Sequence, residues 1–439
     1  MHFFAENSRM VQLLKKIKKT YGMAEPDERE AVLHNFAFLS GLQVFTYFLP
    51  LIVLPYLFRT IGPDKFGLIA FAQALTQYFM TLTDYGFNVS ATKEVSLRQN
   101  EPAEVDKIFS AVMTLKVLFA FSSLVIMGSL VYFVPRFRAD WLVYVFSFGA
   151  VIGNTLFPLW FFQGMEKMRY IAKVNIIGEF LCIALIFILI HKPDDYLLVP
   201  LITSSVLLVT GFLGQYVAFK RLGSRFIFPE RTHLCEQLQS GWNVFTSVLA
   251  INAYTTTRII VLGIFTNNTI TGFYSLAEKL AGICQTFPLT SFSQALFPRL
   301  SKIFHKNKKR AFELMEQIQQ ITVNISIITL PIIFVFAPFL MRIIFGGNYP
   351  ETVIVLRILL VSVLMISSNA FRVQFLLISG HPHLYSKIHM TMAIIGLPLI
   401  LASIYFFSYS GAAFATVAIE AGIFTLTFLA IKKLSFSAK

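Results

Sequence analysis

The sequence is poor in charged residues. Aspartate, glutamate, lysine and arginine together make up 14% of its 439 residues, whereas an ordinary soluble domain contains about 25%. Only 23 residues are acidic, while 56% of the chain is hydrophobic and 47 residues are phenylalanine. So little charge could not give several water-soluble domains a polar surface. The composition therefore excludes a soluble multidomain protein and indicates a protein that lies in the lipid bilayer.

Cysteine is also scarce, and the residue types that build metal sites do not cluster. The three cysteines, Cys182, Cys235 and Cys284, lie far apart, without the spacing of a zinc site or a disulfide framework. The eight histidines are dispersed, and His381 and His383 merely bracket a proline in a short loop. We expect no metal and no organic cofactor.

The signatures of an enzyme are missing as well. There is no glycine-rich phosphate-binding loop and no Asp-x-Asp pair, and Asp194 and Asp195 lie in a short loop. The connections on the outer side of the predicted membrane spans are too short to hold a catalytic domain. The sequence therefore predicts a protein that is not an enzyme.

Long apolar segments, by contrast, are abundant. Windows of about 20 apolar residues predict twelve membrane-spanning helices. They lie near 35–58, 67–91, 109–134, 141–163, 170–190, 196–219, 240–264, 271–297, 317–344, 351–379, 385–408 and 411–431. We expect an all-α polytopic membrane protein with these parts: a basic tail (1–33), an N-terminal six-helix bundle (34–220), a linker (221–239), a C-terminal six-helix bundle (240–431) and a C-terminal tail (432–439).

The distribution of positive charge predicts the orientation. With both termini in the cytoplasm, 26 of the 37 lysines and arginines lie in cytoplasmic segments, six lie in the opposite loops and five lie inside the spans. This bias follows the positive-inside rule. Topology rather than a nucleic-acid partner thus explains the net charge of +14. We expect a multi-pass protein of the cytoplasmic (inner) membrane with both termini cytoplasmic.

The tail at 1–33 contains the basic stretch LLKKIKK at 13–19. Three interpretations fit it: a short amphipathic helix on an anionic leaflet, a disordered tail, or a segment upstream of a later start at Met10 or Met23.

An internal repeat relates the two sets of spans. GLIAFAQAL begins at Gly67 and GFYSLAEKL begins at Gly272, so the pattern G-x-x-x-x-A-[QE]-x-L recurs at an offset of 205 residues. FFQG (161–164) and LISG (377–380) form a second echo. Transporters built from two parallel repeats have a pseudo-twofold axis along the membrane normal and a site between the repeats. We therefore expect two bundles related in this way, with a central V-shaped cavity.

A polar stripe runs along the predicted span 67–91. Five of its polar residues share one face: Gln73, Gln77, Thr81, Asp84 and Asn88. Their successive spacings of 4, 4, 3 and 4 residues keep them on one side of a helix. Such a stripe lines either a seam between helices or a water-filled cavity. For Asp84, an ion pair with Lys116 and a cap on the cytoplasmic helix end are alternative interpretations.

Nine ionisable residues lie inside the predicted spans: Lys116, Arg258, Lys279, Arg357, Arg372, Asp84, Glu179, Glu278 and Glu420. Each costs about 2.5–3.5 kcal/mol near the bilayer centre unless it is solvated or paired. Because five of them are cations, they predict a basic cavity, which suits a phosphate or pyrophosphate. Arg357 could instead extend to the lipid headgroups, and Glu179 and Glu420 could be neutral or locally paired.

Several segments also resemble a known family. The block 49–96 contains RTIGPDKFG (59–67) and TDYGFNVSATKE (83–94), and WFFQG follows at 160–164. These segments resemble bacterial oligosaccharide-unit flippases of the multidrug/oligosaccharidyl-lipid/polysaccharide exporter superfamily. The span layout extends the resemblance over 34–431, although the second half matches mainly in pattern. The 33-residue N-terminal extension departs from the family pattern.

The resemblance implies a function. Such a flippase moves undecaprenyl-pyrophosphate-linked repeat units of O-antigen or capsule from the inner to the outer leaflet by alternating access, often coupled to an H⁺ or Na⁺ gradient. Its partners would be membrane lipids, the lipid-linked glycan and other membrane proteins of glycan assembly.

Within that interpretation the polar residues receive roles. Those expected to contact the pyrophosphate or set the cavity's potential are Arg258, Lys279, Arg372, Lys116 and Arg357. Those expected to contact sugar are Gln73, Gln77, Asn88 and Glu278. Asp84 and Glu278 are the candidates for binding the coupling ion.

Three other functions compete with this one. A cation-coupled multidrug exporter of the same superfamily would favour an acidic cavity, against the basic balance seen here. A membrane glycan polymerase is disfavoured by the short outer loops. A flippase for a peptidoglycan precursor stays open because the headgroup chemistry is shared.

Overall fold

The computed structural model describes residues 26–437, with side-chain environments for 51–286, 300, 303–304 and 307–434. Residues 1–25 of the predicted basic tail lie outside the described residues. Contacts divide the chain into one unit up to Phe48 and a second unit from Leu49 onward. The packing below is that of the second unit.

The described residues are almost entirely helical, as expected of a chain that must satisfy its backbone hydrogen bonds in lipid. The first helices are α2 (Pro26–Asp84), α3 (Phe87–Leu97), α4 (Pro102–Phe133), α5 (Pro135–Ala139), α6 (Trp141–Leu156), α7 (Leu159–Gly164), α8 (Met168–Leu189) and α9 (Leu198–Tyr216). The later ones are α10 (Arg231–Thr255), α11 (Thr257–Phe265), α12 (Asn268–Lys306), α13 (Lys308–Phe345), α14 (Pro350–Ser367), α15 (Ala370–Ile378) and α16 (Pro382–Ser437). Two short helical turns, η1 (Pro193–Leu197) and η2 (Val217–Arg221), flank α9.

Several predicted spans are fused end to end. Among the described residues, eight helical segments are long and apolar enough to cross a membrane. One of them, Pro382–Leu434, covers the last two predicted spans and is interrupted by the non-helical residue Ser408 (φ 53°, ψ −133°). Gly62 (φ 76°, ψ 166°) interrupts α2 in the same way. The all-α multi-spanning architecture is confirmed, whereas the number twelve stays a prediction.

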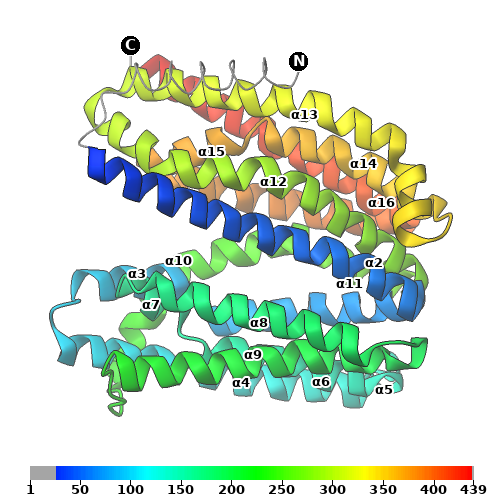
Figure 1. Ribbon diagram of the computed structural model, residues 1–439, viewed down its shortest axis with the longest axis horizontal. Helices are drawn as coiled ribbons and strands as arrows, with labels where there is room; N and C mark the ends of the chain where they lie inside the picture. The colour runs from blue at the N-terminus through cyan, green and yellow to red at the C-terminus, as the bar shows by residue number, and fades with distance from the viewer. Residues whose placement is uncertain (1–25, 438–439) are drawn as a thin grey trace. The chain divides into compact units, whose positions relative to one another are not determined.

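The helices from Leu49 onward pack in two sets. In one, α9 contacts both α6 and α8, and α4 contacts α6; in the other, α14 contacts α12, α13 and α16 (Figure 1). Helix α10 contacts members of both sets, because it packs on α16 as well as on α3 and α4. The predicted boundaries at 220 and 240 and the pseudo-twofold axis stay predictions.

The two glycines of the internal repeat meet each other. A Cβ atom on Gly67 would lie 1.8 Å from the carbonyl oxygen of Asn268, and one on Gly272 would lie 2.1 Å from that of Pro63. Gly67 thus faces Asn268, four positions before Gly272, and Gly272 faces Pro63, four positions before Gly67. Small residues let membrane helices approach this closely, so α2 and α12 cross backbone to backbone at this point.

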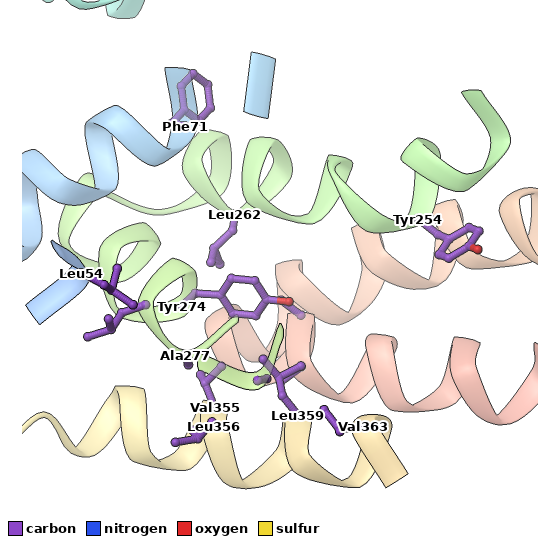
Figure 2. Packing of buried hydrophobic residues seen from close by; sticks show 14 of the residues in the cluster. Leu54, Phe71, Tyr254, Leu262, Tyr274, Ala277, Val355, Leu356, Leu359 and Val363 are labelled. Atoms are coloured by element: carbon purple, nitrogen blue, oxygen red, sulfur yellow. The ribbon is translucent and has the colours of Figure 1, made fainter. Parts of the chain in front are cut away.

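An apolar core holds α12 in place on its other side. Figure 2 shows Tyr274 and Ala277 of α12 lying toward Val355 and Leu359 of α14, with Leu262 of α11 nearby. All five side chains are buried. Residues 274 and 277 share one helical face, so this packing turns the adjacent face, at 275, 278 and 279, toward α2 and α11.

Candidate functional site

A polar cavity of about 320 Å³ lies where α2, α10, α11 and α12 come together. Its lining is Ala70, Gln73, Ala74, Gln77, Thr255, Thr256, Arg258, Ile259, Ser275, Glu278 and Lys279. Five of the residues predicted for the site are among them. The internal repeat supplies two of the walls, since α2 and α12 carry its two copies.

The wall from α2 presents two amides. Gln73 and Gln77 are one turn apart and both are exposed, while Ala70 and Ala74 beside them are buried. The small alanines leave room over this face. Each amide offers two N–H donors and one carbonyl acceptor, so this wall can both donate and accept hydrogen bonds.

The wall from α10 and α11 contains the junction of these two helices. They meet at Thr256. Tyr78 of α2 donates a hydrogen bond to the carbonyl oxygen of Asn252 at 2.9 Å and contacts the hydroxyl of Thr257. Thr256 itself keeps right-handed helical dihedrals (φ −79°, ψ −34°), and its N–H donates to the carbonyl oxygen of Asn252 at 2.9 Å. Thr255 and Thr256 at this junction add threonine hydroxyl groups to the cavity wall.

Two cations reach the cavity, but only one makes an ion pair with a carboxylate among the described residues. The Arg258 guanidinium donates to Glu278 at 2.8 Å, to the carbonyl oxygen of Thr255 at 3.0 Å, and to the hydroxyl of Thr416 on α16. Lys279 is exposed, and no hydrogen bond or ion pair joins its Nζ to another residue in the described part of the chain. Lys279 is thus the cation available to a ligand, whereas Arg258 is held inside the protein.

The predicted polar stripe divides into three parts. Gln73 and Gln77 face the cavity, while Thr81 accepts a 2.7 Å hydrogen bond from Asn252 in the seam between α2 and α10. Asp84 ends α2, and the left-handed residues Tyr85 and Gly86 (φ 41° and 81°) separate it from α3. Asn88 lies beyond this break, on α3, and does not line the cavity.

Asp84 makes an ion pair with Lys116, as one of the two alternative interpretations of Asp84 in the sequence predicts. Lys116 Nζ lies 3.0 Å from Asp84 Oδ1 and donates to the carbonyl oxygen of Asn154 at 3.2 Å. The amide of Asn154 donates to the same carboxylate oxygen at 3.1 Å. The Lys116 side chain is only 1% exposed, so the carboxylate compensates a buried charge and joins α2 to α4 and α6.

Replacing Asp84 by alanine is therefore expected to destabilise the fold, because it leaves Lys116 buried without its carboxylate. Removing one partner of a buried pair costs about 3 kcal/mol. The midpoint of thermal unfolding of the purified protein should fall, and Asp84→Ala/Lys116→Met should recover much of the loss. Wild-type unfolding together with lost transport in Asp84→Ala would instead indicate a role for Asp84 in transport.

The two remaining arginines lie away from the cavity lining. Arg372 lies over the rings of Phe424 and Phe428, 5.4 Å from each ring centroid, and donates to the carbonyl oxygen of Ser368 at 2.7 Å. Arg357 lies over Phe334 and donates to its carbonyl oxygen at 3.0 Å. A contribution of Arg357, Arg372, Lys116 or Asn88 to substrate binding stays a prediction.

Some lining residues were not singled out from the sequence. Thr255 and Thr256 belong to the run TTTR at 255–258, and three consecutive threonines inside an apolar span could have indicated the helix junction. Among the described residues, no group of three or more His, Cys, Asp or Glu side chains could hold a metal ion. The cavity lining offers a ligand hydrogen-bonding groups and the positive charge of Lys279.

The helical fold is similar to that of two solved multi-spanning membrane proteins. The structure of "Lipid II flippase MurJ, inward closed conformation" superposes with a TM-score of 0.75 at 14% identity, covering 90% of this chain and 87% of that one. An inward-facing multidrug transporter of the MATE family and MOP superfamily superposes with a TM-score of 0.70 at 13% identity, covering 89% and 96%. At these identities the likeness establishes the fold.

The chain belongs to the polysaccharide biosynthesis protein family, which it matches over residues 32–304. It is 29% identical over 400 residues to the "Putative O-antigen transporter" of Escherichia coli (strain K12), covering 91% of this chain and 96% of the relative. A protein of the same name from Shigella dysenteriae is 26% identical over 405 residues, covering 91% and 99%. The family resemblance noted in the sequence is confirmed.

Proposed function

We propose that the protein is a flippase. It carries an undecaprenyl-pyrophosphate-linked repeat unit of O-antigen or capsule from the inner to the outer leaflet of the cytoplasmic membrane. The observation that carries this proposal is the cavity in which exposed glutamines and half-buried threonines surround the available lysine Lys279. The family and the relatives named as O-antigen transporters support the same substrate class.

The size and chemistry of the cavity suit the polar head of such a lipid. Its volume of about 320 Å³ is at the lower end for small-ligand sites, so it would hold a pyrophosphate with the first sugar rather than a whole repeat unit. Lys279 would bind a phosphate oxygen as a point charge. Gln73 and Gln77 would hydrogen-bond the sugar hydroxyls, while the polyprenyl tail would stay in the surrounding lipid.

The net charge of the lining also bears on the alternatives. Arg258 and Lys279 against the single carboxylate of Glu278 give the described lining one excess positive charge. This excess is smaller than the five intramembrane cations alone would give, yet it still disfavours an amphipathic organic cation as the substrate. A multidrug exporter is therefore the weaker proposal.

Transport would proceed by alternating access between two bundles. In the predicted orientation, with both termini cytoplasmic, the crossing of Gly67 and Gly272 closes the outer end beside the cavity. Glu278 is the better candidate for a coupling H⁺ or Na⁺, because it lines the cavity, whereas Asp84 already compensates Lys116. Neutralising Glu278 would release Arg258 and change the charge that the substrate meets.

The substitution Lys279→Gln tests the proposed site. It removes the charge and keeps a polar side chain that is one atom shorter, so we expect roughly tenfold less surface glycan at an unchanged amount of membrane protein, equivalent to about 1.4 kcal/mol. Lys173→Ala, which changes an exposed lysine on α8 away from the cavity, is the control. Normal surface glycan in Lys279→Gln would remove Lys279 from the site.

Deletion of the gene tests the class of function. A flippase predicts that surface glycan is lost and that lipid-linked single repeats accumulate on the inner leaflet. Single repeats that reach the outer face without being polymerised would indicate a polymerase instead. Loss of cell-wall synthesis with normal surface glycan would indicate a peptidoglycan-precursor flippase.

A further inference from the structure

An exposed aromatic segment lies between η2 and α10. The stretch Leu222–Glu230 has no regular secondary structure, and within it Phe226, Ile227 and Phe228 are 50%, 44% and 91% exposed. The rings of Phe226 and Phe228 meet edge to face, with centroids 5.9 Å apart. Three consecutive large apolar residues at a water-facing surface would be costly, so this segment calls for an apolar environment.

Helix α4 holds the segment in a fixed conformation. The backbone N–H of Arg225 donates to Asp106 Oδ1 at 2.8 Å, and the N–H of Ile227 donates to Ser110 Oγ at 2.8 Å. Asp106 and Ser110 are buried and lie one helical turn apart. Because they bind alternate N–H groups of the segment, its backbone is extended there, and side chains two residues apart lie on the same side. Phe226 and Phe228 are therefore presented together.

The two residues of α4 that bind the segment lie near one end of a predicted membrane span, so the segment lies near that end as well. Ser110 stands at the start of the apolar run of α4, and the segment follows directly on the last turns of α9 and η2. The exposed side chains at the end of α9 and in η2 are apolar too: Phe212, Tyr216 and Phe219 are exposed to 62%, 57% and 38%. The exposed apolar side chains at the end of α9 and in η2 are thus followed directly in the chain by the segment that holds the two phenylalanines.

Basic side chains flank the aromatic ones. Lys220, Arg221, Arg225 and Arg231 are all exposed, with Glu230 as the one acidic residue between positions 220 and 231. Apolar rings that insert at the boundary of headgroups and acyl chains, with neighbouring lysine and arginine near anionic lipids, are the composition of a membrane-interface anchor.

We propose that residues 220–231 form a membrane-interface anchor, in which Phe226 and Phe228 insert among the lipid acyl chains and the flanking basic residues contact anionic headgroups. Asp106 and Ser110 are its positioning residues. The anchor fastens the predicted linker between the two bundles to the membrane beside α4. Lipid is favoured over a protein partner because exposed apolar side chains of α9 and η2 lead directly into the segment. This inference does not depend on the substrate of the transporter.

Spin-label accessibility in vesicles tests the anchor. A single cysteine at Phe228 is placed in the full-length chain with Cys182, Cys235 and Cys284 changed to serine, reconstituted into vesicles that contain phosphatidylglycerol, and labelled with a nitroxide. Its collision rates with oxygen and with a water-soluble nickel chelate are compared with those of two reference sites. Phe121, 65% exposed on α4, is the lipid reference, and Glu101, exposed in the loop before α4 and outside the proposed anchor, is the water reference.

The anchor predicts that the label at 228 collides preferentially with oxygen, as at 121. A preference for nickel like that at 101, or low collision with both reagents, would overturn it, the latter pointing to a covering protein surface. Asp106→Ala/Ser110→Ala should shift the label at 228 toward nickel while leaving the label at 121 unchanged. An unshifted label would overturn the positioning role of these two residues.

Discussion

Replacing Gly67 by alanine is expected to abolish transport while leaving the protein in the membrane. The new Cβ would lie 1.8 Å from the backbone carbonyl oxygen of Asn268. Because the clash is with backbone, turning a side chain cannot relieve it. Overpacking of this kind costs about 1–3 kcal/mol, and the higher value would lower the population of this closed arrangement roughly 100-fold. Surface glycan, measured by immunoblot in a strain that lacks the chromosomal copy, should be nearly absent.

A cross-linking measurement shows whether transport is lost because the crossing of α2 and α12 is disrupted. The side chains of Asp64 and Thr269 are 3.4 Å apart at this crossing, so cysteines placed there in a cysteine-free background should be joined by a short bifunctional reagent. Gly67→Ala should prevent the cross-link. Gly128→Ala on α4 and Gly282→Ala on α12 are the controls, because a Cβ on either meets nothing within 4 Å. Full transport by Gly67→Ala, or equal damage by the controls, would contradict the role of the crossing.

Replacing Arg258 by alanine is expected to be the most damaging change in the cavity. Arg258 is 8% exposed and ties together α11, α12 and α16 through Glu278 and Thr416. Its loss leaves the half-buried carboxylate of Glu278 without a partner, at a cost of about 3 kcal/mol. Both the amount of folded protein in the membrane and the surface glycan should fall to a small fraction of wild type.

The double substitution separates stability from transport. Arg258→Ala/Glu278→Ala removes both charges, so we expect the amount of folded protein to recover while transport stays low, because two cavity residues are gone. Arg258→Lys should keep the charge but lose the contact with Thr416, and it should be intermediate in both measurements. Normal transport by Arg258→Ala would show that the ion pair is needed neither for the fold nor for the substrate.

The sequence predicted the helical, multi-spanning character of the chain because that property is local. An apolar run long enough to cross a bilayer has few alternatives to helix, since lipid cannot satisfy its backbone groups. The repeat of Gly67 and Gly272 was also visible in the sequence. The close approach of the two glycines in space was not visible. Helical periodicity shows on which face of its helix each glycine lies, but not which helix packs against that face.

The cavity was predictable in part for the same reason. Gln73 and Gln77 stood out as polar residues on an otherwise apolar helix, and the structure puts both in the cavity lining. The stripe to which they belong nevertheless ends at the left-handed turn of Tyr85 and Gly86, so Asn88, which a continuous helix would align with them, is separated from them. A change of backbone direction over two residues leaves no trace in helical periodicity.

Charge pairing was predictable only for Asp84, whose ion pair with Lys116 was one of the alternatives given by the sequence. The other intramembrane cations look alike in the sequence, yet the structure pairs Arg258 with Glu278 and places Arg372 over two phenylalanine rings. Which cation is left without a carboxylate depends on helices distant in the sequence. The structure singles out Lys279 in the cavity for this reason, and a count of basic residues could not.

Reconstituted transport tests the central claim most directly. Vesicles containing the purified protein receive a lipid-linked repeat unit in one leaflet, and the fraction of its sugar that reaches the other leaflet is followed with a membrane-impermeant glycosidase. Wild-type protein is expected to speed this transfer well above that in empty vesicles, and equal amounts of Lys279→Gln are not. Transfer no faster than in empty vesicles for the wild type would contradict the claim that this protein is a flippase for lipid-linked glycans.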